Sequence, residues 1–232
     1  MWRWLGRLTL AAVLLSLMAQ WVFIPLAEQV LSRAARRWAS GEVEVRVEAF
    51  PAWQLLQGHL DRVKINAKEV RLNGLTLAEL QGEFRQVRFS WWAAWHHGDF
   101  SSSFQEPGNI QVQVREEDLT QYLSGRWNLP LQDLAVAIAG TRVRLTASLV
   151  VAGQKLPVLL QGTMTLTPPG TIRVVPDRVQ VGLLSPGPEL REKLAAYTTF
   201  PLPLDTLPVR VEFHRLEGGE GQLTLHGSVW RR

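Results

Sequence analysis

Apolar side chains alternate with polar ones through most of the chain after residue 42, and this period of two limits the possible folds most. Val43, Val45 and Val47 alternate with charged residues, and residues 143–151 repeat the pattern. Because successive side chains of a β-strand point to opposite sides, each such segment can bury one face and expose the other. Asn73-Gly74 predicts a tight turn between two strands. Further strands are expected within residues 63–65, 75–89, 136–138, 156–166, 172–183, 209–213 and 223–229.

A few helices are expected beside these strands. The apolar positions of residues 26–38 recur every four residues, as in an amphipathic helix. Shorter helices are expected at residues 91–97, 116–123 and 188–197. The predicted fold class is therefore α+β: a long curved antiparallel β-sheet that wraps or packs on a few helices, preceded by one transmembrane helix.

The transmembrane helix is predicted from the uncharged stretch Leu8–Ala27. As a helix this stretch would span roughly 30 Å, the thickness of a hydrocarbon core. A cleaved signal peptide, with its cleavage site near Leu17-Met18-Ala19, is the open alternative. The predicted domains are residues 1–27, an anchor or signal segment, and residues 28–232, an extracytoplasmic domain. The charges that flank this stretch are nearly balanced, so they do not determine its orientation. Long domains tend to translocate whatever their charge. We therefore expect a single-pass cell-membrane protein with its bulk on the periplasmic or extracellular face.

Charge and composition exclude several classes of site. The 25 basic and 21 acidic residues are spread along the chain, so no nucleic-acid interface is expected. The absence of cysteine removes disulfides, thiolate chemistry and Cys-ligated metals. His96 and His97 would point about 100° apart on a helix, so no metal site is expected. The acids Glu116, Glu117 and Asp118 are expected to complement a helix dipole. No familiar catalytic spacing is present, so neither an enzyme nor a cofactor is expected.

Several motifs in order resemble a known family. Residues 45–58 (VRVEAFPAWQLLQG) resemble the v-P-x-x-x-L-L-x-G opening of the LmeA-like phospholipid-binding proteins. Residues 60–75 and 104–119, and the later Leu207-Pro208, are similar to the elements that follow in that family. The likeness covers roughly residues 26–229. It implies an envelope protein that binds glycerophospholipid outside the cytoplasmic membrane, and a similarity to tubular lipid-binding folds, in which a curved sheet wraps a helix and leaves an apolar groove.

The candidate lipid contacts are apolar side chains of the first half of the chain. Trp91, Trp92 and Trp95 have two open interpretations: they enter the membrane interface or line a groove entrance, or they fill the core. The alternating faces likewise either enclose a groove or pack together as a closed core. The predicted lipid-binding residues are Phe50, Leu55, Leu56, Val63, Ile65, Phe84, Val87, Phe89, Trp91, Trp92 and Trp95.

The sequence thus predicts a membrane-anchored, extracytoplasmic phospholipid-binding protein of the cell envelope, with lipid transfer as an extension of that role. Its expected partners are phospholipid and, through the N-terminal helix, the cytoplasmic membrane, and the sequence leaves protein partners unknown. The alternative is a non-enzymatic envelope scaffold or accessory subunit with a closed core. A hydrolase acting on envelope lipids is the third hypothesis, and it lacks a nucleophile and base in suitable spacing.

Overall fold

The computed structural model describes residues 28, 32, 41–49, 54, 57–88, 103–104, 107–126, 131–151, 153–182, 199–202 and 209–230. Within them the strands form two antiparallel sheets. The first sheet runs in the order β1 (Val43–Glu48), β2 (His59–Leu72), β3 (Leu75–Arg88), β5 (Gly108–Arg115), β12 (Gln222–Trp230) and β11 (Arg210–Gly218), with β4 (Ser103–Phe104) beside β3. The second runs in the order β10 (Thr199–Pro201), β9 (Thr171–Val181), β8 (Gln154–Thr167), β7 (Arg142–Val151) and β6 (Leu131–Ala139).

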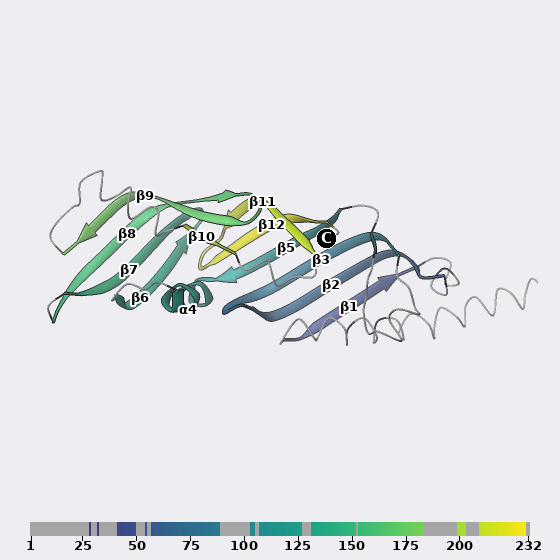
Figure 1. The fold of residues 1–232 in the computed structure, drawn as a ribbon, viewed down its shortest axis with the longest axis horizontal. Coiled ribbons are helices and arrows are strands. Elements are labelled where there is room, and N and C mark those ends of the chain that lie inside the picture. The colour runs from purple at the N-terminus through teal and green to yellow at the C-terminus, as the bar shows by residue number, and fades with distance from the viewer. Residues whose placement is uncertain are drawn as a thin grey trace, which may run out of the picture.

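The predicted α+β architecture with one long sheet was wrong. The described residues are mostly strand, divided between two sheets, and α4 (Glu116–Arg126) is the one helix whose full length they include. The physical reason is pairing: β6, β7, β8 and β9 are joined by successive hairpins, so they hydrogen-bond to one another and close a second sheet. The two sheets follow one another along the long axis of the molecule, and α4 lies where they meet rather than being wrapped by either (Figure 1).

Other expectations have mixed outcomes. The helix predicted at residues 116–123 is confirmed by α4. The turn at Asn73-Gly74 is also confirmed, with φ angles of 44° and 88° in the left-handed region. The helices predicted at residues 91–97 and 188–197 lie outside the described residues, as does that at 26–38 apart from helical Glu28 and Ser32. The predicted transmembrane segment, residues 1–27, also lies outside them. None of the helices that the structure describes is both long and apolar enough to cross a membrane.

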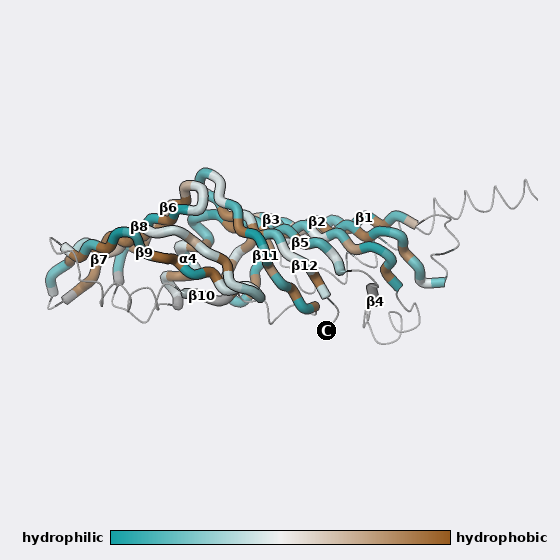
Figure 2. Tube along the Cα trace, turned by 90° about the horizontal axis from the view of Figure 1, so that it is seen from above, coloured by the Kyte–Doolittle hydropathy of each residue, from teal (hydrophilic) through white to brown (hydrophobic). Residues whose placement is uncertain are grey.

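The β2–β3 hairpin keeps its apolar side chains on one face by changing the phase of its alternation twice. Along β2 the fully buried residues are Leu60, Val63, Ala67, Val70 and Leu72, with spacings that include steps of three residues. Beside these steps the backbone enters the left-handed region, at Glu69 (φ 53°) on β2 and at Gln86 (φ 50°) on β3. Such irregularities rotate the following side chains and increase strand twist. The alternation of apolar and polar residues along both sheets is visible in Figure 2.

The contact between the sheets is made by backbone and by α4. Glu116 Oε2 accepts a hydrogen bond from the Ile138 amide on the edge strand β6 (3.2 Å), and Thr120 Oγ1 accepts one from the Val136 amide (3.1 Å). The Gly221 amide donates to the Ile138 carbonyl (3.1 Å). These bonds satisfy backbone groups that an edge strand would otherwise leave unpaired.

The hydrophobic core is continuous from one sheet to the other. Its members come from the apolar faces of both sheets, and α4 adds Leu119, Tyr122 and Leu123. The largest side chains with almost no exposure are Phe213, Leu60, Leu75, Leu123, Ile172, Leu223 and Leu225. The apolar face of the first sheet is therefore part of one core that both sheets share.

Candidate lipid-binding face

One face of the first sheet carries rows of apolar residues that run across its strands. Residues directly opposite one another in antiparallel strands share a face. The middle row joins Val45, Ile65, Gly82, Ile110, Gly227 and Phe213. A neighbouring row joins Val43, Ala67, Leu80, Val112, Leu225 and Leu216. These rows make a wide hydrocarbon surface of the kind to which an acyl chain can bind.

Most of this surface is buried, but the centre of the β2–β3 hairpin is not. Ile65, Leu80 and Phe84 are only half-buried and pack against the buried core. Two of them flank Gly82 on β3, and Ile65 lies opposite Gly82 on β2. We call Ile65, Leu80, Gly82 and Phe84 the Phe84 cluster. It is a part of the first sheet's apolar face where a ligand could replace solvent on several neighbouring large side chains.

Glycines leave room for the Phe84 ring. A Cβ on Gly108 would lie 2.5 Å from the ring, and one on Gly82 would lie 3.0 Å from it. The ring therefore rests directly on the backbone of β3 and β5, where any side chain would displace it. The result is a flat apolar floor in which an aromatic ring covers two glycines, an arrangement that stabilises glycine-containing sheets.

The predicted lipid-binding residues have different places in this structure. Ile65 and Phe84 belong to the Phe84 cluster, whereas Val63 and Val87 are fully buried, at 5% and 7% exposure. Leu80 and the two glycines were not among the predicted residues, although the alternation Leu80-Gly82-Phe84 marks one face of a strand. The remaining predicted residues lie outside the described part: Phe50, Leu55, Leu56, Phe89, Trp91, Trp92 and Trp95.

The opposite face of the same sheet is polar, and many of its charges are paired. Glu48 on β1 lies 3.3 Å from the Arg62 guanidinium and 3.5 Å from the Lys64 ammonium on β2. Glu83 on β3 pairs with Arg62 (3.4 Å) and Arg85 (3.2 Å). Exposed pairs of this kind contribute little stability individually. They do divide the sheet into one apolar and one polar side.

The acids at the start of α4 have structural surroundings. Glu116 bonds to the edge strand β6, as described above. Burial raises the pKa of the Asp118 carboxyl, and Glu117 and Glu69 raise it further, while nearby Arg115 acts in the opposite direction. In the part of the chain that the structure describes, no three His, Asp or Glu side chains come together as a metal site would require. The arrangement around α4 positions the two sheets.

Comparison with known proteins gives one match. Residues 19–228 match the model of a family described as LmeA-like phospholipid-binding. No curated protein and no solved structure matches the chain significantly.

Proposed function

This chain belongs to the LmeA-like phospholipid-binding family, and from that premise we propose that the Phe84 cluster holds the acyl chains of the phospholipid. The observation that carries the proposal is that three neighbouring large side chains, Ile65, Leu80 and Phe84, are only half-buried on a face whose residues are mostly buried. A hydrocarbon chain laid across them would remove apolar surface from water on both partners. Each methylene so buried contributes about 0.8 kcal/mol, so about ten methylenes, most of an acyl chain, must lie on apolar surface to supply roughly 8 kcal/mol, from which the cost of association is subtracted.

The glycine floor supports the same position. Gly82 and Gly108 let the Phe84 ring lie flat on the sheet, so an acyl chain can lie along the outer side of that ring and of its half-buried neighbours Ile65 and Leu80. The full burial of Val63 and Val87 favours the alternative of a closed core at those two positions. The proposal therefore concerns the Phe84 cluster and not the whole predicted set.

The wider role that we propose is a non-catalytic one outside the cytoplasmic membrane. The uncharged stretch of residues 8–27 supports membrane association of the chain. A protein held at a membrane with an acyl-chain site on a sheet can pick up a lipid from that membrane. Transfer of the lipid to another membrane or protein is the further step of this proposal.

A binding experiment with a matched control tests the acyl-chain site. The full chain in detergent micelles is titrated with a phospholipid that carries a fluorescent acyl chain. Phe84→Asp should weaken binding about tenfold or more, because a carboxylate in contact with hydrocarbon must lose hydration or become protonated. Val175→Asp is the control, since Val175 lies on the second sheet and is 47% exposed.

The expected result is a loss with Phe84→Asp and unchanged binding with Val175→Asp, while both variants keep the β-sheet signal in circular dichroism. Equal affinity of the two variants for the labelled phospholipid would reject the Phe84 cluster as the site. A wild-type chain that does not bind the probe at all would support the closed-core scaffold instead. Anchoring is tested separately, by asking whether deletion of residues 8–27 releases the chain from membranes.

A further inference from the structure

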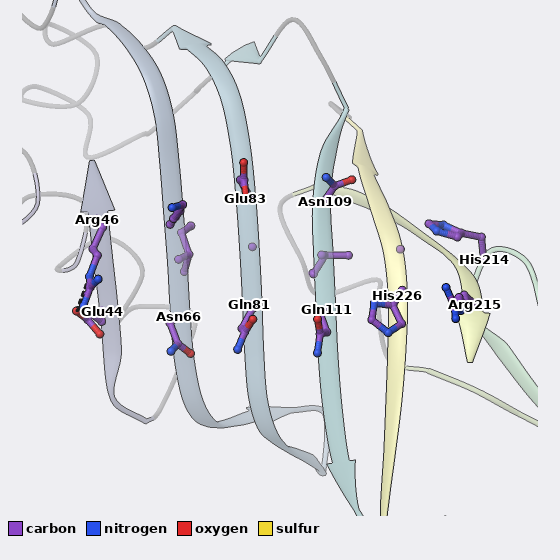
Figure 3. A pocket seen from close by; sticks show the side chains of 15 residues that line it. Glu44, Arg46, Asn66, Gln81, Glu83, Asn109, Gln111, His214, Arg215 and His226 are labelled. Atoms are coloured by element: carbon purple, nitrogen blue, oxygen red, sulfur yellow. Dashed lines mark hydrogen bonds and ion pairs between the residues drawn. The ribbon is translucent and has the colours of Figure 1, made fainter. Parts of the chain in front are cut away.

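The polar face of the first sheet carries a second feature, on the side opposite the Phe84 ring. One polar side chain from each of six neighbouring strands lies in a single row across the sheet (Figure 3). The centre of the row consists of amides from β2, β3 and β5 and a histidine from β12. We call these four central residues the amide row: Asn66, Gln81, Gln111 and His226.

The amide row lines a depression in this face. Its volume is about 670 Å³, and Asn109 and Glu83 from the next row also line it. Gly82 and Gly227 contribute to its walls with main chain alone. This volume lies within the range of small-molecule sites, roughly 300–1,000 Å³. The depression is therefore large enough for a ligand that extends across several strands.

The charges that border the amide row are neutralised within the protein. At one end Arg46 pairs with Glu44 at 2.9 Å, and at the other Arg215 pairs with Glu217. Gln81 donates a hydrogen bond to Glu79 at 3.0 Å, which leaves its own carbonyl oxygen as an acceptor. The centre of the depression thus offers amide donors and acceptors between paired charges, which suits an uncharged ligand.

Two atoms of the amide row lack hydrogen bonds. Asn66 Oδ1 and His226 Nε2 are buried and have no hydrogen-bond partner among the residues that the structure describes. His226 Nε2 lies 3.5 Å from Glu217 Oε2, within ion-pair distance but without hydrogen-bond geometry. Most buried polar atoms in native proteins are satisfied, and leaving one unsatisfied costs about 1–3 kcal/mol. Because both atoms are shielded from solvent, a ligand hydroxyl satisfies them only once the side chains that cover them move aside.

We propose that the amide row is a binding site for a neutral glycan chain. A hydroxyl group both donates and accepts, as an amide does, so each amide can bond to a sugar hydroxyl in either sense. Neighbouring strands are about 4.8 Å apart, comparable to the length of one hexose unit, so successive sugars can meet successive strands. The cations around the depression, Arg46, Lys64 and Arg215, each pair with a carboxylate, so no uncompensated positive charge among them favours a phosphorylated ligand. The side chains of the amide row lie on the face opposite Phe84, although Ile65 and Gly82 of the Phe84 cluster also line the depression.

The test uses the full chain in lipid nanodiscs or a detergent without a sugar head group, because a glycoside detergent would occupy the site. Cellohexaose, maltohexaose and chitohexaose are the probes, and binding is measured by saturation-transfer NMR. At least one hexasaccharide should bind with a Kd of about 1 mM or tighter. The double variant Gln81→Ala with Gln111→Ala should raise that Kd about tenfold, since each amide contributes about one hydrogen bond.

Two further variants make the outcome decisive. Gln132→Ala removes an exposed amide from β6 of the second sheet and should leave the Kd unchanged. Gln111→Glu keeps the shape of the side chain but replaces the two N–H donors of the amide with an acceptor oxygen, so it should weaken binding without affecting folding. Binding of the fluorescent phospholipid should be the same in all of them. The proposal is overturned if none of the three hexasaccharides binds, if the double variant binds as the wild type does, or if an extended peptide competes for the same amides.

Discussion

Replacement of Gly218 by alanine tests how the two sheets are joined. Gly218 ends β11, and a Cβ at this position would overlap the carbonyl group of Gly140, in the turn between β6 and β7. No rotation of a side chain can relieve this overlap, because the obstacle is backbone. The two sheets must therefore move apart where they meet.

The cost follows from the contacts that this movement breaks. The Gly140 amide donates to the Gly219 carbonyl at 3.3 Å, and the Gly221 amide donates to the Ile138 carbonyl at 3.1 Å. Losing two net hydrogen bonds costs about 1–3 kcal/mol, and overpacking adds about 1–3 kcal/mol, so the free energy of unfolding should fall by about 4 kcal/mol. For a chain of this size such a loss lowers Tm by roughly 8–16 °C.

The assay is thermal unfolding of the full chain in detergent micelles, followed by circular dichroism. Gly125→Ala is the matched control: Gly125 lies in α4 and a Cβ there meets nothing within 4 Å. Alanine in that helix should raise stability by about 0.5–1 kcal/mol. A Gly218→Ala variant as stable as Gly125→Ala would show that the sheets are not held together as described.

Three further predictions concern stability. Glu116→Ala should lower the free energy of unfolding by about 1–3 kcal/mol, because the Ile138 amide loses a charged acceptor; a denaturation midpoint equal to that of exposed Glu117→Ala would contradict this. The raised pKa of Asp118 means that its folded-state carboxyl favours the proton, so its contribution to stability is present below pH 3.8 and lost as the pH rises. Asp118→Asn should therefore have a higher free energy of unfolding than the wild type at neutral pH and an equal one in acid. Denaturant unfolding at both pH values tests this. A higher free energy of unfolding that persists in acid would contradict it. Glu69→Gly should raise the free energy of unfolding by about 0.5–1 kcal/mol, because glycine adopts the left-handed φ of 53° without strain. Glu79→Gly is the control, since Glu79 lies in the same hairpin without such an angle, and it should lower stability in the same melting assay.

The sequence predicted individual strands better than their assembly. Val43, Val45 and Val47 mark the buried face of β1 as expected, and Asn73-Gly74 marks the turn after β2. In β2, however, only the segment around Val63 and Ile65 was predicted. The phase change beside Glu69 interrupts the alternation, so a single strand of 14 residues resembles two shorter ones. Alternation also gives a strand its buried face without giving its partner, and for that reason the division into two sheets was not foreseen.

The candidate sites differ in how far sequence could reveal them. Ile65 and Phe84 were predicted from their apolar character, and the structure adds Leu80 and Gly82 because pairing brings β2 and β3 together. The amide row left no local signal. Its members are separated by long stretches of chain, and only the order β2-β3-β5-β12 places them side by side.

Photo-crosslinking tests most directly whether the acyl chains lie on the Phe84 cluster. The full chain is incubated with a phospholipid that has a diazirine at the end of one acyl chain, irradiated, and digested, and adducts are assigned to single residues by mass spectrometry. Adducts concentrated on Ile65, Leu80 and Phe84 are the predicted result. Adducts on the polar side of the same strands, at Asn66, Gln81 or Gln111, would contradict the account, as would a first sheet that carries no adduct.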